Sequence, residues 1–178
     1  MELIRLQSAN DEYTPELIEL YTDTFPLNQR HTEKDFIALM ESNPLFNCEV
    51  VLMNNSMIGF INYWDFDDFI FLEHLAVEPP LRGHKLGEKL MKILQENHPK
   101  PIVLEAERAE DSEYGERRIE FYRRLGFETI DVEYMQPPYR PEDKPFPLEI
   151  LSNHTDYATD NFDAIKRTIY REVYKLNL

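Results

Sequence analysis

Four cations gather in one short stretch of a chain that is otherwise acidic. They lie between positions 82 and 92 with a single opposing carboxylate, and they are Arg82, Lys85, Lys89 and Lys92. The whole chain of 178 residues has 19 Lys+Arg against 34 Asp+Glu, a formal charge of −15, so this stretch reverses the local sign. A helical pattern begins at about Leu86, and a helix N-terminus adds about half a positive charge. Four cations together with a helix N-terminus favour the binding of a pyrophosphate group. The alternative is that Gly83 only turns the chain and that the lysines form a solvated helix face.

Alternating periodicities predict the elements that must position this stretch. A strongly apolar strand at 69–77 leads into it and is long enough to lie centrally in a sheet. Further strands are expected at 2–7, 46–53, 57–64, 101–105, 127–135 and 148–151. Helices are expected after the cap Asn10-Asp11 and at 33–40, 86–97, 112–125 and 159–176, with a proline-rich connection at 136–147. The predicted fold class is α+β (mixed α/β), with one domain over 1–178, a core to about 151 and a C-terminal helical extension over 152–178.

Two separated motifs resemble the GNAT superfamily of N-acetyltransferases. Leu75-Ala76-Val77 followed by Arg82-Gly83-His84-Lys85-Leu86-Gly87 resembles a strand of Leu-x-Val type that leads into Arg/Gln-x-x-Gly-x-Gly/Ala at the start of a helix. Phe121-Tyr122-Arg123-Arg124-Leu125-Gly126-Phe127 resembles a helix ending Phe-Tyr-x-x-x-Gly-Phe. The order of elements agrees over residues 1–151. The resemblance implies the GNAT fold, a mixed, mostly antiparallel sheet of about seven strands flanked by helices.

The resemblance also implies acetyl-CoA as a co-substrate. By this resemblance the residues that bind it are Leu75, Ala76, Val77, Arg82, Gly83, His84, Lys85, Leu86 and Gly87. The sequence departs from the family at Lys85, where glycine is usual, and at Gly115, where asparagine is frequent. If position 85 needs a positive φ, lysine is strained by about 1 kcal/mol or more. If it does not, the lysine adds a cation beside the phosphates, and this second interpretation is preferred.

Two residues are expected to carry the chemistry that the resemblance implies. Glu73 is the candidate base, since relatives carry Glu or His at this place on the strand, on the same face as Val77. His74 is the competing base, but strand alternation should direct it to the opposite face. Tyr122 is the candidate acid, since the family match places its hydroxyl beside the sulfur of CoA. The structural alternatives are a surface carboxylate, a core histidine and a core tyrosine.

The expected reaction is transfer of an acetyl group to a primary amine of a small cationic acceptor. The acidic and aromatic stretch 63–68 and the connection 136–147 are expected to border that acceptor, or else 63–68 is a solvated hairpin. A non-catalytic acyl-CoA-binding or interaction module on the same fold is the alternative. The apolar stripe of the C-terminal helix must bury against the chain's own sheet or against a second copy, and flanking Tyr170 and Tyr174 favour the latter, a homodimer.

The composition excludes several other classes. A charge of −15 disfavours sequence-independent binding to nucleic acid. No apolar stretch is long enough for a membrane span, and the first residues lack the pattern of a signal peptide, so a cytoplasmic protein is expected. The single cysteine, Cys48, is expected to be a buried apolar side chain, and the five histidines show no metal-ligand spacing.

Overall fold

The computed structural model describes residues 1–111 and 113–176 and contains a seven-stranded sheet. The strand order is β1-β2-β3-β4-β5-β9-β6, and every neighbouring pair is antiparallel except β4 and β5. The strands are β1 (Glu2–Leu6), β2 (Phe46–Met53), β3 (Ser56–Asp65), β4 (Ile70–Val77), β5 (Ile102–Ala106), β6 (Glu128–Thr129) and β9 (Glu149–Ser152). A separate hairpin pairs β7 (Met135–Gln136) with β8 (Phe146–Pro147). The predicted α+β class with a mostly antiparallel sheet is confirmed.

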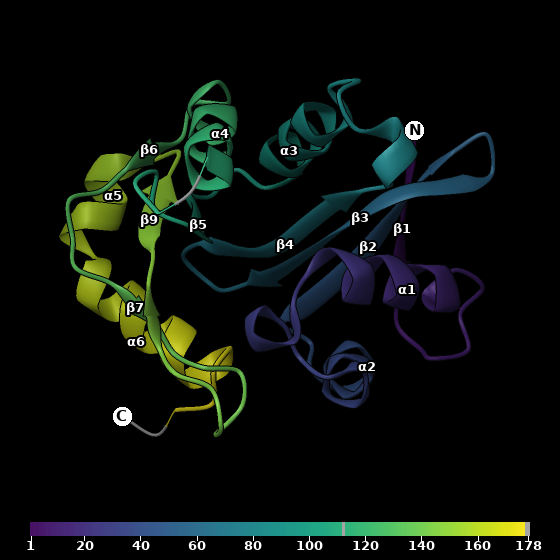
Figure 1. The fold of residues 1–178 in the computed structure, drawn as a ribbon, viewed down its shortest axis with the longest axis horizontal. Coiled ribbons are helices and arrows are strands. Elements are labelled where there is room, and N and C mark those ends of the chain that lie inside the picture. Colours follow the sequence, from purple (N-terminus) through teal and green to yellow (C-terminus); the bar gives the residue numbers. More distant parts are fainter. Residues whose placement is uncertain (112, 177–178) are drawn as a thin grey trace.

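Helices cover both faces of the sheet (Figure 1). They are α1 (Thr14–Thr24), α2 (Glu33–Ser42), α3 (Leu86–Asn97), α4 (Glu113–Arg123), α5 (Thr155–Asp160) and α6 (Phe162–Glu172), with short 3₁₀ turns η1 (Leu27–Gln29) and η2 (Pro79–Leu81). In Figure 1, α3 and α4 lie above the sheet and α1 and α2 below it, while α5 and α6 lie at its left end. Each face therefore has its own apolar core. None of the helices in the described ranges is long and apolar enough to cross a membrane.

The C-terminal helix differs from its prediction in two ways. It is divided at Asn161 into α5 and α6. Its apolar stripe, which includes Ile165 and Ile169, is buried in the core that the chain itself forms below the sheet. Tyr174 is buried there too, so this stripe gives no support for a homodimer. The strand expected at 127–135 is present only as the two short strands β6 and β7, separated by irregular backbone.

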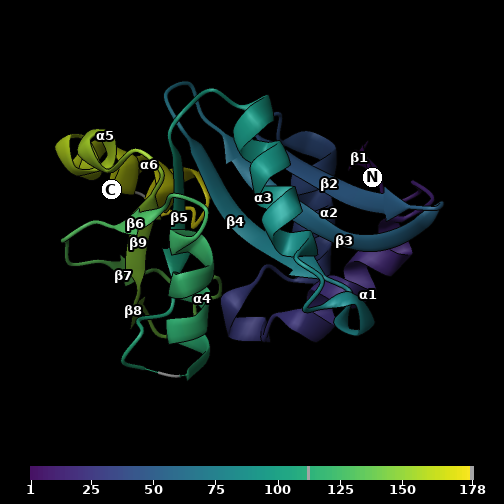
Figure 2. The ribbon, with the colours of Figure 1, turned by 90° about the horizontal axis from the view of Figure 1, so that it is seen from above.

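The two parallel strands at the centre separate part of the way along. β4 and β5 pair at Ile70↔Ile102, Phe71↔Val103 and Leu72↔Leu104, and at no later residue. β4 nevertheless continues to Val77, and β5 continues along β9 to Ala106. Figure 2 shows the two strands diverging, with α3 crossing β4 and α4 lying beside β5. Beyond Leu72, the edge of β4 that faces β5 has no strand partner in the described residues, and at the end of the strand the Val77 carbonyl accepts a hydrogen bond from Arg82 Nε at 3.0 Å.

A β-bulge lies at the same point on β4. Asn62 of β3 faces His74 and the next residue, Tyr63, faces Leu72, so Glu73 is an extra residue on β4 without a partner on β3. A bulge of this kind shifts the alternation of side chains along the strand. Glu73 therefore does not follow the face that simple alternation assigns to it.

Candidate active site

The basic stretch forms the turn between β4 and α3. Gly83 has φ +85° and Lys85 has φ +58°, so both adopt the left-handed conformation, and α3 begins at the next residue. The preferred interpretation, in which position 85 needs no positive φ, is wrong. Lysine in this conformation costs about 1 kcal/mol or more relative to glycine. The turn keeps this strain because its backbone must reverse direction before the helix begins.

A cavity of about 510 Å³ lies over this turn. Seven of the residues that line it come from the end of β4 and the turn itself, and they are Val77, Leu81, Arg82, Gly83, Lys85, Leu86 and Gly87. Within the described residues, the backbone N–H groups of 83–88 donate to no protein acceptor. Free N–H groups at a helix N-terminus with two cations beside them form an anion site. The geometry therefore suits the pyrophosphate that the sequence motif implies.

The other residues expected to bind CoA have different positions. Leu75 packs on Gly87, where an added Cβ would lie 3.7 Å from its Cδ2. The side chain of Ala76 is buried in the core below the sheet, so only its backbone can face a ligand. His84 is exposed and its Nδ1 lies 3.1 Å from the Leu81 carbonyl oxygen, so its imidazole closes the turn.

Glu73 lies below the sheet, at the centre of a buried polar network. Trp64 Nε1 donates to Glu73 Oε2 at 2.7 Å, and the Tyr139 hydroxyl donates to Oε1 at 2.9 Å. His31 Nε2 is 3.0 Å from the same oxygen. The side chain is only 1% exposed, and burial opposes its charge, but the nearby His31 outweighs burial and lowers the pKa of Glu73 to about 2. Glu73 is therefore an ionised carboxylate held by three partners.

The bulge corrects one expectation about faces. Glu73 was expected on the same face as Val77, and His74 on the opposite face. His74 does lie opposite to Val77, but Glu73 lies there as well: both are on the side of α1 and α2, whereas Leu75 and Val77 pack toward α3. His74 packs edge-on against Tyr21, its Nε2 lies 3.1 Å from the Gln29 carbonyl oxygen, and burial lowers its pKa. These contacts favour a structural role for His74.

A second buried carboxylate, Glu105, lies on β5 across from Glu73. Both line a small inner cavity of about 60 Å³ at the point where β4 and β5 separate. Glu105 accepts hydrogen bonds from the hydroxyls of Tyr134 and Tyr174 and from Gln136 Nε2. Burial outweighs these three donors and raises the pKa of Glu105 to about 7. Sequence reasoning did not single out Glu105, because a lone acidic residue in a short strand carries no local signal.

The raised pKa of Glu105 predicts how stability depends on pH. An ordinary glutamate has a pKa of 4.5, so the folded state binds the proton more tightly. This stabilisation is present below about pH 4.5 and is lost as the pH rises through about 7. Glu105→Gln is expected to reduce the pH dependence of the unfolding temperature between pH 5 and 8, and to exceed the wild type by several degrees at pH 8. Thermal unfolding by circular dichroism measures this, with exposed Glu128→Gln as the control; parallel curves for wild type and Glu105→Gln would contradict it.

Tyr122 lies on α4 in the core above the sheet. Its ring packs against Phe121 and Phe127, with centroid distances of 5.0 and 5.9 Å. Within the described residues its hydroxyl makes no hydrogen bond, and burial raises its pKa. Its neighbours on the helix reach the two cavities: Phe121 lines the cavity over the turn and Arg118 lines the inner one. Tyr122 itself lines neither of these two cavities, so its role as the acid stays a prediction.

Gly115 is explained by close packing at the start of α4. A Cβ on this residue would lie 2.4 Å from the carbonyl oxygen of Arg108, closer than any real contact. An asparagine therefore does not fit here without a shift of the backbone.

Both segments expected to border the acceptor reach Glu73, through Trp64 of 63–68 and Tyr139 of 136–147. In the stretch 63–68, Phe66 is buried against Trp64, and Asp65 is paired with Lys100 at 2.5 Å. These acidic and aromatic groups therefore stabilise the core and the turn.

Sequence reasoning missed His31, Tyr139 and Tyr174 as parts of this network. They come from three distant segments, before α2, after β7 and after α6, and the fold brings them together below the bulge. A histidine between two predicted helices, a tyrosine in a proline-rich connection and a tyrosine near the end of the last predicted helix have no spacing that could have shown this.

The fold and the site together define a protein in which one strand has an anion-binding turn at its end and a buried carboxylate along its length. Residues 45–129 match the family model of the acetyltransferase (GNAT) domain. Residues 45–129 are therefore a GNAT acetyltransferase domain, and the whole chain has the fold of a GNAT-family structure.

Three similar proteins support this assignment. A structure described as a "Putative acetyltransferase from GNAT family from Bacteroides thetaiotaomicron" has a TM-score of 0.93 at 29% identity, over 99% of this chain and 100% of that one. The Bacillus subtilis protein named "Putative acetyltransferase YjbC" is 30% identical over 110 residues, which are 61% of this chain; the match spans 55% of that curated relative. Arabidopsis thaliana Naa50, in complex with the bisubstrate analogue CoA-Ac-MVNAL, has a TM-score of 0.60 at 19% identity, over 85% of this chain and 98% of that one.

Proposed function

We propose that the protein is an acetyl-CoA-dependent N-acetyltransferase that moves the acetyl group directly from the thioester to a primary amine. One observation carries the proposal: β4 has the anion-binding turn at its end and, at the point where it leaves β5, the buried carboxylate Glu73. A donor site and a proton acceptor thus lie on one strand. The complex of Naa50 with a CoA-containing analogue supports acetyl-CoA as the donor.

The turn and β4 hold the donor. Arg82, Lys85 and the free N–H groups of 83–88 bind the pyrophosphate, and the open edge of β4 beyond Leu72 offers backbone groups to the pantetheine arm and the thioester carbonyl. Backbone N–H groups stabilise the oxyanion that forms on attack. When bound, acetyl-CoA supplies the activated acyl group.

The buried network prepares the amine. An amine with a pKa of about 10.4 is neutral in about one molecule in 2,500 at pH 7, a handicap of roughly 4.6 kcal/mol. Glu73, which the nearby His31 helps to keep ionised, attracts the ammonium and takes its proton as the nitrogen attacks. The C–N bond then forms, the C–S bond breaks, and Tyr122 gives its proton to the departing thiolate.

The prediction that the acceptor is cationic has lost its main structural support. It depended on the stretch 63–68, whose aromatic groups are buried and whose Asp65 is already paired. The primary amine remains the proposed acceptor group, and diamines are included in the tests below.

Acetyl-CoA is expected to raise the unfolding temperature more than ATP or NAD at equal concentration. Lys85→Gly is expected to raise the unfolding temperature of the free protein, by removing about 1 kcal/mol of strain, and to reduce the shift produced by acetyl-CoA. Lys92→Gln, which removes an exposed charge from the same stretch, is the control and should change neither. Equal shifts with all three compounds would contradict the proposal. A strong acetyl-CoA shift without CoA release for any amine would instead indicate the non-catalytic acyl-CoA-binding module.

A further inference from the structure

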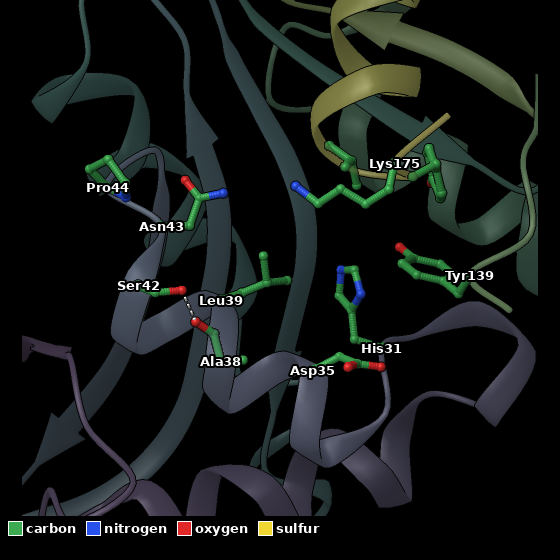
Figure 3. A pocket seen from close by; sticks show the side chains of 11 residues that line it. His31, Asp35, Ala38, Leu39, Ser42, Asn43, Pro44, Tyr139 and Lys175 are labelled. Atoms are coloured by element: carbon green, nitrogen blue, oxygen red, sulfur yellow. Dashed lines mark hydrogen bonds between the residues drawn. The ribbon is translucent and has the colours of Figure 1, made fainter. Parts of the chain in front are cut away.

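A large cavity below the sheet lies next to the buried network. It measures about 580 Å³ and is bounded by α2 on one side and by the chain that follows α6 on the other (Figure 3). We call it the outer cavity. Its lining includes His31, Tyr139 and Lys175. Its volume is ample for a small metabolite, whereas the inner cavity of about 60 Å³ holds only a few atoms.

The outer cavity ends at two side chains that contact the proposed proton acceptor. Tyr139 lines both cavities and donates to Glu73, which lines the inner one. His31 lines the outer cavity, its ring lies 4.7 Å from that of Tyr139, and its Nε2 is 3.0 Å from Glu73 Oε1. A molecule in the outer cavity can therefore present an amine to His31 and Tyr139, which lie next to Glu73. Its remaining atoms extend away from the thioester.

Lys175 extends into this cavity from a strained position. It has φ +57°, and the Leu176 N–H donates to the Tyr170 carbonyl at 2.9 Å, so Lys175 occupies the left-handed residue that closes α6. Glycine is the residue preferred there. Asn54 and Asn55 form a hairpin turn, and the remaining two residues with positive φ other than glycine are Lys85 and Lys175. Each of these lysines lines one of the large cavities. A side chain kept at a strained position beside a cavity indicates a role in binding.

The charge of Lys175 has no partner of opposite sign in the described part of the chain. Its Nζ lies 5.4 Å from the centroid of the Trp64 ring, a contact that holds the ammonium in place without neutralising it. Figure 3 shows the side chain directed across the cavity toward Asn43. The acid that lines the cavity, Asp35, accepts a hydrogen bond from the Thr32 hydroxyl at 2.7 Å. The cavity thus offers a fixed cation to an anionic group.

We propose that the outer cavity is the acceptor site, and that it takes an amine whose far end carries a carboxylate or a phosphate bound by Lys175. This inference deepens the proposed function and rests on it. Two opposite groups of the acceptor are then recognised at two places: the amine at His31 and Tyr139, and the anion at Lys175. Val173, Tyr174 and Lys175, which wall the cavity, lie outside the residues 45–129 that match the family model.

Matched acceptors of equal length test the proposal. The panel contains ω-amino carboxylates with their carboxamides, aminoalkyl phosphates with the corresponding amino alcohols, and diamines. Release of CoA is measured for each as a function of acceptor concentration. We expect the anionic member of at least one pair to have a kcat/KM about 10–100-fold higher than its neutral partner, because a charge-assisted hydrogen bond is lost in the latter. The pair that shows the difference distinguishes carboxylate from phosphate.

Two variants of Lys175 separate recognition from folding. Lys175→Gln and Lys175→Gly should raise KM for the anionic acceptor about 10–100-fold, with little change for its neutral partner. Lys175→Gly should also unfold at a temperature equal to or above that of the wild type, because it relieves the strain. Lys166→Gln, on α6 with its ammonium over the rings of Phe162 and Tyr170, is the control and should leave both acceptors unchanged.

The failure of this inference differs from the failure of the proposed function. Equal kinetics for anionic and neutral acceptors, preference for diamines, or unchanged KM in Lys175→Gln overturns the inference while acetyl transfer stands. If no amine is acetylated, the proposed function fails, and thermal shift with the same compounds still decides the binding claim. Stabilisation by an anionic member that is lost in Lys175→Gln supports it; no such stabilisation overturns it.

Discussion

Glu73→Gln is expected to lower kcat roughly 100- to 1,000-fold, the usual contribution of a positioned general base. The amide cannot take the proton of the ammonium, although it fills the same space between Trp64 and Tyr139. Because the pKa of Glu73 is lowered to about 2, the carboxylate is ionised throughout the range measured, so the loss of kcat should be of similar size at every pH. Steady-state release of CoA between pH 5 and 9 measures the loss at each pH.

The acetyl-CoA-induced thermal shift provides the control for this variant, because Glu73 lies below the sheet and the donor turn lies beyond the other end of β4. The shift should match that of the wild type. A double variant, His31→Gln with Glu73→Gln, should be no slower than the slower single variant, since residues that act as one unit are not additive. An unchanged kcat in Glu73→Gln would remove Glu73 from the mechanism.

Tyr122→Phe is expected to lower kcat about 10- to 100-fold and to leave stability nearly unchanged. The phenyl ring keeps the contacts with Phe121 and Phe127, and in the described residues the hydroxyl makes no hydrogen bond whose loss would destabilise the core. The missing proton donor should slow departure of the thiolate and remove the basic limb of the pH–rate profile. Normal turnover by this variant would show that Tyr122 is only a core side chain.

Phe121→Leu is a useful companion to Tyr122→Phe. Phe121 contacts Gly87 at the start of α3, where its ring lies 3.4 Å from the position of an added Cβ. Its truncation should weaken binding of acetyl-CoA and raise the KM for it, whereas Tyr122→Phe should change kcat. The two adjacent residues thus separate donor binding from proton transfer.

The donor half of the site was predictable from the sequence because it is local. The apolar strand at 69–77, the turn and the helix that follows are consecutive, and their charges stand out against an acidic chain. The cavity over the turn is accordingly lined by Val77, Arg82, Gly83, Lys85, Leu86 and Gly87, all of which were expected. The mostly antiparallel sheet of seven strands could also be anticipated, since motifs and elements occur along the chain in the order of the family.

The errors have a common physical origin in backbone geometry. Strand alternation assigned Glu73 and His74 to opposite faces, but the bulge opposite Asn62 and Tyr63 shifts the alternation. The left-handed conformation of Lys85 could not be anticipated either, because side-chain type alone disfavours it. Neither feature has a signature in a single sequence.

The acceptor half was not predictable because it is assembled from distant segments. His31, Tyr139 and Lys175 are separated by more than thirty positions each, and only the packed fold shows that they surround one cavity. The raised pKa of Glu105 is likewise a product of burial and of the chain that returns after α6.

The bulge on β4 has a consequence for how this protein can diverge. It turns Glu73 away from the face that Leu75 presents to α3, so in the proposed mechanism one strand serves the coenzyme above the sheet and the acceptor below it. Mutations in the segments below the sheet can therefore change which amine is acetylated without changing the binding of acetyl-CoA above the sheet. Deleting a single residue at the bulge would restore the regular alternation of side chains along β4. The specificity for the coenzyme and the specificity for the amine could then no longer change independently.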